Sequence, residues 1–176
     1  MELDLEQHKE QPDRYSRQRL FSPIGNAGQD KLEQAKVLVV GAGALGTGIA
    51  ETLVRAGIGH LVIADRDYVE WSNLQRQQLF SEADAAERVP KAIAAKRRLA
   101  AINSQVRIDA HVMDVDPEEL ESLISGVNLI MDATDNFDTR LMINDISQNT
   151  EFPGFMADAS AVTGLPIRFC PVLRLA

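Results

Sequence analysis

Residues 36–46 read K-V-L-V-V-G-A-G-A-L-G, and this stretch decides the fold. Residues 36–40 form an almost uninterrupted apolar run rich in valine, which is typical of a buried parallel strand. The glycine turn that follows, a G-x-G-x-x-G pattern, opens a helix predicted over residues 47–56 and closed by Gly57. Its three glycines are Gly41, Gly43 and Gly46. A strand, a glycine turn and a helix in this order predict a parallel sheet with a crevice at the carboxyl ends of its strands.

The rest of the chain continues this alternation. Further strands are predicted over residues 61–64, 106–112 and 127–131, and helices over residues 91–102, 117–124 and 138–149. Residues 29–34 are predicted to be the end of a short helix. Pro90 stands ahead of one helix, so we expect it at the favoured first helical position. The pattern predicts an α/β fold, a Rossmann-like parallel sheet with helices on both faces. Residues 67–89 are long, polar and irregular, and long connections of this kind usually carry function.

Composition limits the classes of function. The 176 residues are 45% hydrophobic and 25% charged, with a formal net charge of −8, which argues against a nucleic-acid partner. The apolar runs are too short to cross a membrane, and the polar leader of residues 1–13 has no apolar signal segment, so we expect a cytoplasmic protein. Cys170 is the single cysteine, which excludes a multi-cysteine zinc site within this chain.

Asp65 supplies a partner for the glycine turn. It ends the second predicted strand, where a carboxylate can accept hydrogen bonds from ribose hydroxyls, while the backbone N–H groups of Gly41, Gly43 and Gly46 face a phosphate. These four residues predict an adenine-nucleotide site. The alternative is that the glycines only allow close packing of a helix against a strand. ATP and NAD both fit such a pocket, so other residues must distinguish them.

Three polar segments favour a triphosphate. R-Y-S-R-Q at residues 14–18 carries Arg14 and Arg17, S-N-L-Q-R-Q at residues 72–77 carries an amide and a guanidinium, and Lys91 opens the next helix. Arginine matches phosphate oxygens bidentately, and lysine supplies a compact charge. Such cations neutralise a triphosphate while a carboxylate attacks its α-phosphate. The alternative for Arg14 is a solvated surface charge.

The fourth predicted strand ends in D-A-T-D-N, with Asp132 and Asp135 at the sheet edge. Carboxylates placed beside phosphates can hold Mg²⁺, which prefers oxygen ligands. Each aspartate also has a structural alternative, since Asp132 can cap the turn and Asp135 can cap the next helix.

Six ordered motifs, R-Y-S-R-Q, G-A-G-A-L-G, D-R-D, S-N-L-Q-R-Q, P-K-A and D-A-T-D-N, together resemble those of the ThiF/MoeB/E1 adenylyltransferases of thiamine and molybdopterin synthesis. The resemblance runs from about Arg14 to Pro153, with Ala44 where members often have glycine. It implies ATP- and Mg²⁺-dependent adenylation of the C-terminal glycine of a ubiquitin-like, ThiS- or MoaD-like sulfur-carrier protein, by a homodimer.

The resemblance also implies roles for single residues. Asp65 binds the ribose, and the phosphates contact Asn73, Arg76 and Lys91. Asp135 holds Mg²⁺, and Arg17 reaches the active site of the partner subunit. The catalytic set is therefore Arg17, Arg76, Lys91 and Asp135.

Residues 154–176 depart from the family pattern, which continues with a glycine-rich segment and two C-x-x-C pairs that bind zinc. One permitted set of codons from Gly154 onward, read in another frame, resembles the family's own continuation. We therefore interpret residues 14–153 as the ATP-binding domain, incomplete relative to the family, and residues 154–176 as a frameshifted tail without the zinc site. Truncation of this kind is expected to impair activity.

Two other classes of function stay open. An NAD-binding oxidoreductase needs only the glycine turn and Asp65, but no convincing catalytic acid or base is found among His8, His60 and His111. A non-catalytic dimerising domain is the other alternative.

Overall fold

The computed structural model describes residues 13–149. The elements, in chain order, are α1 (Ser16–Arg19), α2 (Gly25–Gln34), β1 (Lys36–Val40), α3 (Ala44–Ala56), β2 (His60–Ala64), the 3₁₀ turn η1 (Trp71–Asn73), α4 (Glu82–Ala86), α5 (Lys91–Ile102), β3 (Arg107–His111), α6 (Pro117–Leu123), β4 (Leu129–Asp132) and α7 (Phe137–Asn149). Within these described residues, no helix has both the length and the apolar character needed to cross a bilayer. The leader and the 154–176 tail lie outside the described residues, apart from Asp13.

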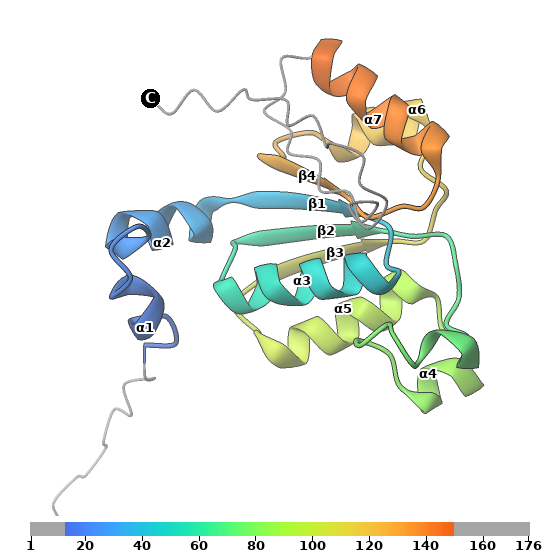
Figure 1. Ribbon diagram of the computed structural model, residues 1–176, viewed down its shortest axis with the longest axis horizontal. Helices are drawn as coiled ribbons and strands as arrows, with labels where there is room; N and C mark the ends of the chain where they lie inside the picture. Colours follow the sequence, from blue (N-terminus) through green and yellow to red (C-terminus); the bar gives the residue numbers. More distant parts are fainter. Residues whose placement is uncertain (1–12, 150–176) are drawn as a thin grey trace, which may run out of the picture.

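The four strands form one parallel sheet in the order β3-β2-β1-β4 (Figure 1). Val40 at the end of β1 lies opposite Ala64 of β2 and Asp132 of β4. The chain therefore leaves these three strands at the same level, which brings the glycine turn, Asp65 and the D-A-T-D-N segment to one edge. The predicted α/β, Rossmann-like architecture is confirmed.

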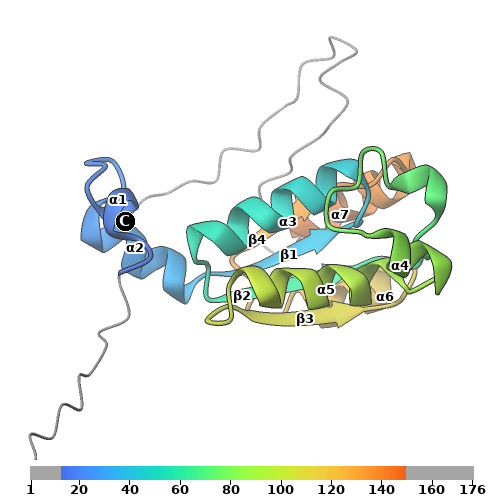
Figure 2. The ribbon, with the colours of Figure 1, turned by 90° about the horizontal axis from the view of Figure 1, so that it is seen from below.

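Helices cover both faces of the sheet. In Figures 1 and 2, α3 and α5 lie side by side on one face, and α6 and α7 lie on the other. Alternate strand residues enter the two cores: Val39 and Ile63 pack with α3 and α5, whereas Leu38 and Ile130 pack with α6 and α7. All four are at most 1% exposed. Burying such a side chain stabilises a fold by about 1.5–3 kcal/mol, which explains why β1 is apolar on both sides.

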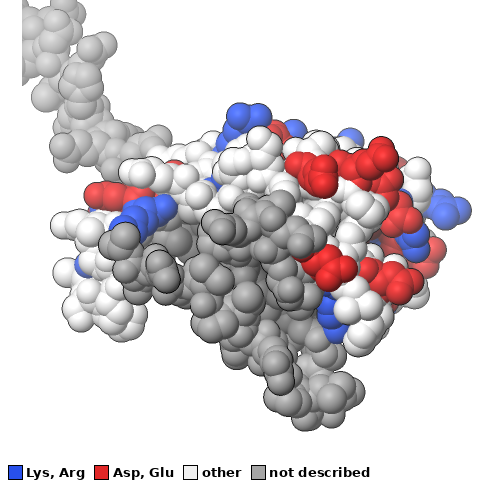
Figure 3. All heavy atoms as spheres, turned by 90° about the horizontal axis from the view of Figure 1, so that it is seen from above, with Lys and Arg blue, Asp and Glu red and all other residues white. Residues whose placement is uncertain are grey.

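The surface agrees with the acidic composition. Figure 3 views the molecule from the side of α6 and α7, and acidic side chains gather toward the end at which the strands terminate. Basic side chains on the described part of this face lie in separate spots.

Several predicted boundaries were wrong. Helix α4 lies inside the segment expected to be irregular, and Ser81 and Asp84 cap it reciprocally: the Ser81 N–H donates to Asp84 Oδ2 over 2.8 Å. Pro90 is the N-cap of α5 rather than its first residue, with an extended ψ of 134°. Helix α3 begins at Ala44, three residues early, and β4 is displaced to Leu129–Asp132. The short helix α1 was not predicted.

Candidate functional site

A cavity of about 820 Å³ opens at the carboxyl ends of the strands. Seven of the residues predicted for the site line it: Gly41, Gly43, Asp65, Asn73, Arg76, Lys91 and Asp135. Their convergence follows from the parallel register, because each predicted motif comes directly after a strand or in the long connection after β2. Two predicted residues do not line it, Gly46 and Arg17.

The three glycines of the turn have different structural roles. Gly41 has φ +95°, and a Cβ there would lie 2.9 Å from the carbonyl oxygen of Ala133. A Cβ on Gly46 would overlap the carbonyl oxygen of Gly41, so Gly46 allows the first turn of α3 to pack against the loop. Gly43 has open space where a side chain would be. The close-packing interpretation therefore holds for Gly46, and Gly43 leaves its backbone accessible from the cavity.

Asp65 joins the glycine turn to the loop after β2. Its Oδ2 accepts the N–H of Ala42 over 2.6 Å, and its Oδ1 accepts the N–H of Asp67 over 2.7 Å. Burial raises the pKa of this carboxyl above its usual 3.8, and these two hydrogen bonds, with the charge of Lys91, offset only part of that rise. Each carboxylate oxygen has a further lone pair, so Asp65 can still accept hydrogen bonds from a ribose.

The predicted phosphate-binding groups occupy the wall formed by residues 66–91. Lys91 Nζ lies 2.9 Å from Asp67 Oδ2, and its side chain is 8% exposed. Arg76 is exposed and donates from Nη1 to the carbonyl oxygen of Ser72 over 3.0 Å. Asn73 is buried, and its Oδ1 accepts the N–H of Glu70 over 3.1 Å. Asn73 thus holds the 3₁₀ turn in shape, while Arg76 and Lys91 present charge to the cavity.

The structure adds lining residues that the sequence did not single out. Gln77 is 4% exposed, and its Oε1 is a buried side-chain atom without a hydrogen-bond partner in the described structure. Burying an unpaired acceptor costs about 1–3 kcal/mol, a cost that binding sites often carry. In the sequence, the position of Gln77 within the S-N-L-Q-R-Q motif could have indicated that it belongs to the site. Arg66 and Arg88 also line the cavity, and Arg88 belongs to none of the six motifs.

The two aspartates at and just after the end of β4 have different roles. Asp132 is 1% exposed; its Oδ1 accepts the N–H and hydroxyl of Thr134 over 2.9 and 2.8 Å, and its Oδ2 pairs with Nε of Arg140 over 3.2 Å. Asp132 therefore takes the structural alternative. Asp135 is exposed and lines the cavity, and Asn136 takes the capping position of α7 by accepting the N–H of Asp138 over 3.0 Å.

These side chains suit a Mg²⁺ ion that is held jointly by the protein and the phosphates, rather than one that is enclosed by protein ligands alone. Among residues 13–149, no three histidine, cysteine or acidic side chains converge on one point. Mg²⁺ is commonly held by one or two carboxylates together with phosphate oxygens and water, and Asp135 can supply one such carboxylate.

The sequence around this cavity matches a known protein family. The ThiF family profile matches residues 15–172. The chain belongs to the ThiF family. It is 52% identical over 158 residues to the "Sulfur carrier protein ThiS adenylyltransferase" of Bacillus subtilis (strain 168), covering 90% of this chain and 47% of the relative. It is 42% identical over 137 residues to the "Sulfur carrier protein adenylyltransferase" of Thermus thermophilus, covering 78% of this chain and 50% of the relative.

Solved structures of the ThiF type agree. The crystal structure of E. coli MccB with ATP has a TM-score of 0.73 and 29% identity, over 84% of this chain and 46% of that chain. The chain spans about half the length of the curated relatives it matches. The family match passes through Pro153 and includes most of residues 154–176. The frameshift hypothesis for residues 154–176 stays a prediction, to be tested by sequencing the gene around the Pro153 codon.

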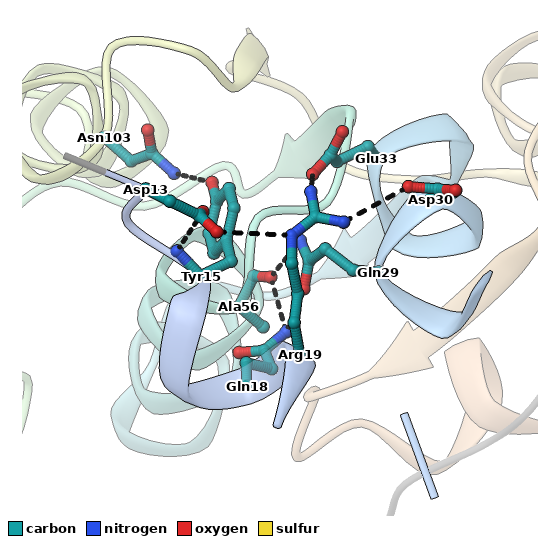
Figure 4. A network of polar contacts seen from close by, with 9 residues as sticks. All are labelled: Asp13, Tyr15, Gln18, Arg19, Gln29, Asp30, Glu33, Ala56 and Asn103. Carbon is teal, nitrogen blue, oxygen red and sulfur yellow. Dashed lines mark hydrogen bonds and ion pairs between the residues drawn. The ribbon is translucent and has the colours of Figure 1, made fainter. Parts of the chain in front are cut away.

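The R-Y-S-R-Q motif of this ThiF-family chain lies away from the cavity, at the amino ends of the strands beside α2 (Figure 1). Figure 4 shows its polar network: Tyr15 accepts a hydrogen bond from Asn103 over 2.9 Å, and Gln18 donates to the carbonyl oxygen of Ala56 over 3.0 Å. Arg14 donates to the carbonyl oxygen of Ile102 over 2.8 Å. Most of the motif therefore anchors α1, and Arg14 is a structural residue rather than a free charge.

Arg17 is the exception within the motif. Its side chain is exposed and makes no hydrogen bond or ion pair with the residues that the structure describes. Helix α1, which carries Arg17, lies at the end of the sheet opposite the cavity of the same chain. A contribution of Arg17 to a nucleotide site therefore requires the site of another chain.

The described histidines do not serve the cavity of this ThiF-family chain. His60 begins β2, far from its carboxyl end, and its Nε2 lies 2.7 Å from Asp109 Oδ2. His111 ends β3, but it is not among the lining residues. His8 lies outside the described residues. Neither described histidine is placed to act as an acid or base toward a nicotinamide.

Proposed function

We propose that this chain carries the ATP-binding part of an adenylyltransferase that activates the C-terminal glycine carboxylate of a ubiquitin-like sulfur-carrier protein. The observation that carries the proposal is the single cavity shared by the accessible Gly43 backbone, Asp65, Arg76 and Lys91. Such a set suits a ribose joined to a charged phosphate chain. The relatives named as sulfur-carrier adenylyltransferases support the same reaction.

The chemistry requires little covalent participation from the protein. A carboxylate oxygen of the carrier attacks the α-phosphorus, the bond to the bridging oxygen of the β-phosphate breaks, and pyrophosphate leaves with that electron pair. The products are an acyl-adenylate and pyrophosphate. Both reactants are anions, so catalysis depends on neutralising the phosphate chain and holding it in line. Arg76 and Lys91 supply that charge here, and Asp135 would hold the Mg²⁺ that adds to it.

The first test is ATP binding by calorimetry with the full chain. Charge-assisted hydrogen bonds are worth about 1.5–3 kcal/mol, so Arg76→Ala is expected to weaken ATP binding roughly 10- to 100-fold. Arg55→Ala is the matched control, because Arg55 is 59% exposed on α3 and pairs with Glu51 outside the cavity. Equal affinity of the wild type and Arg76→Ala would refute the phosphate role. Tighter binding of NAD than of ATP would favour an oxidoreductase instead.

The reaction itself is tested by pyrophosphate exchange into ATP. Exchange that depends on a carrier protein supports adenylation, and ATP binding without exchange in the presence of every carrier favours a non-catalytic dimerising domain. We propose a ThiS-like carrier first, because the relative at 52% identity is named for ThiS. A MoaD-like carrier in a parallel assay decides between the two.

We further propose that two chains form a homodimer in which Arg17 serves the site of the partner. The support is its position: an exposed guanidinium without a described partner, at the end of the sheet opposite its own cavity. Mixing Arg17→Ala with Arg76→Ala tests this. If Arg17 acts across the dimer, random mixing restores about a quarter of wild-type exchange, because half of the dimers then contain one intact site. Recovery no greater than the sum of the separate variants would contradict it.

A further inference from the structure

We propose that Arg88 is a further phosphate-binding residue of this cavity and contacts the anionic chain of the nucleotide directly. The inference rests on the proposed ATP site but names a residue outside all six recognised motifs. Arg88 lies between α4 and α5, three positions before Lys91, and lines the same cavity as the glycine turn and Arg76.

The guanidinium of Arg88 has an uncommitted charge. Four cationic side chains of the described structure line the cavity, and three of them are engaged. Arg66 pairs with Asp114 over 2.6 Å, Lys91 pairs with Asp67 over 2.9 Å, and Arg76 donates to a backbone carbonyl over 3.0 Å. The Arg88 side chain makes no hydrogen bond or ion pair with any described residue.

The electrostatic balance of the cavity also favours Arg88 as a phosphate-binding residue. Its lining carries five carboxylates, Asp65, Asp67, Glu70, Asp114 and Asp135, against the four cations. A polyphosphate entering this space meets cations that are already held by acids or carbonyls, apart from Arg88. A guanidinium without a partner gives up no existing contact when it binds phosphate, and it can present two parallel N–H groups to the phosphate oxygens.

The backbone at Arg88 adopts an unusual conformation. Arg88 has φ +49°, and among the described residues other than glycine it alone has a positive φ. It occupies the left-handed position that ends α4: its N–H donates to the carbonyl of Ala85 over 3.2 Å, and the N–H of Val89 donates to that of Asp84 over 3.0 Å. Glycine is the usual residue at this position. An arginine held there at a conformational cost indicates a requirement for its side chain.

The neighbouring backbone fixes where Arg88 stands. The N–H of Val69 donates to the carbonyl of Val89 over 2.9 Å, and the N–H of Lys91 donates to that of Asp67 over 2.8 Å. Val89 is 7% exposed and anchors the segment in the core. These contacts bind residues 88–91 to the loop that leaves β2, so Arg88 and Lys91 are presented from one wall.

The test compares Arg88→Gly with wild type for three probes: ATP, inorganic pyrophosphate and adenosine. We expect the variant to bind ATP and pyrophosphate about 3- to 10-fold more weakly and adenosine equally well, because only the anionic chain contacts Arg88. Thermal unfolding shows whether the variant has a folding defect. Glycine relieves the positive φ, so the Tm of Arg88→Gly should be at least that of the wild type. Arg97→Ala is the charge-matched control, since Arg97 is exposed on α5 outside the cavity.

The measured affinities test the role of Arg88 separately from the proposed function. If wild type binds ATP and Arg88→Gly binds it equally well, the role of Arg88 is refuted and the proposed function stands. If Arg97→Ala weakens ATP binding as much as Arg88→Gly, the effect is one of total charge and the direct contact is refuted. If wild type fails to bind ATP, the proposed function and this inference fail together. Should Arg88→Gly fold poorly, Arg88→Asn, which also tolerates the left-handed conformation, replaces it with the same expectations.

Discussion

The ammonium of Lys91 lies 2.9 Å from Oδ2 of Asp67, with the lysine side chain 8% exposed and the aspartate side chain 56% exposed. The pair is therefore asymmetric: a nearly buried cation is neutralised by an acid at the cavity surface. When a triphosphate enters, its oxygens can take over from Asp67 as the counter-charge of Lys91. We therefore expect Asp67 to occupy the place of a phosphate in the free protein and to compete with the nucleotide for Lys91.

The variant Asp67→Asn tests this relationship. Without nucleotide, the free energy of unfolding should fall by about 1 kcal/mol, because Lys91 loses a partly exposed partner. With nucleotide, the phosphates restore the counter-charge, so the rise in Tm caused by ATP should be larger than in wild type. Differential scanning calorimetry with and without ATP measures both effects. An equal ATP-induced shift in the two proteins would show that Asp67 does not compete with phosphate.

The variant Gly46→Ala tests the packing role of Gly46, the third glycine of the turn. A Cβ at this position overlaps the carbonyl oxygen of Gly41, so Gly46→Ala should cost at least about 2 kcal/mol of stability and weaken ATP binding by displacing the turn. Gly48→Ala is the control in the same helix, because the nearest atom to its added Cβ is Gln78 Nε2 at 3.9 Å. That change should stabilise the protein by roughly 0.5–1 kcal/mol. Chemical denaturation of both variants checks the contrast, and similar effects would contradict it.

Much of the fold was predictable from the sequence because the strands and turns carry strong local signals. Residues 36–40 are apolar on both faces, and Gly57 closes α3 in the left-handed conformation, as the sequence predicted. The parallel order of the strands then fixes which motifs meet. The site could therefore be assembled from residues that closely follow strands, such as Asp65 and Asp135.

The other parts of the fold and of the site could not be predicted from the sequence, because they depend on tertiary contacts. Helix α4 is five residues long, and its capping pair uses Asp84 where a glutamate is the commoner signal. Asp132 and Asp135 share one motif, and their different roles follow from tertiary structure: Asp132 is buried and pairs with Arg140, eight residues later, whereas Asp135 is exposed to the cavity. The sequence did not indicate Arg88, since the features that distinguish it are a backbone conformation and the lack of a side-chain partner within the described structure.

Tyr15 provides a test of the structural part of the R-Y-S-R-Q motif. Its hydroxyl accepts a hydrogen bond from Asn103 over 2.9 Å, and Asn103 also donates to the carbonyl oxygen of Val54 over 2.9 Å. Tyr15→Phe should therefore reduce the free energy of unfolding by about 1 kcal/mol and leave ATP affinity unchanged. Asn103→Ala should cost about 2–3 kcal/mol, because it removes both bonds and also the one that Asn103 Oδ1 accepts from the N–H of Gln105 over 3.2 Å. A loss of ATP affinity in Tyr15→Phe would instead assign the motif to the nucleotide site.

The pH dependence of adenosine binding tests Asp65. Burial raises the pKa of this carboxyl above 3.8, and the N–H groups of Ala42 and Asp67 only partly oppose the rise. The stability that the protonated form contributes is complete below the unfolded-chain value and is lost as the pH rises through the folded pKa. Binding has the opposite sign, since a ribose hydroxyl donates to the ionised carboxylate. Affinity for adenosine, which has no titrating phosphate, should therefore fall with decreasing pH, at a midpoint above 3.8. Asp65→Asn should bind adenosine weakly and without this pH dependence. A wild-type affinity that stays constant down to the acid unfolding of the protein would remove Asp65 from the ribose site.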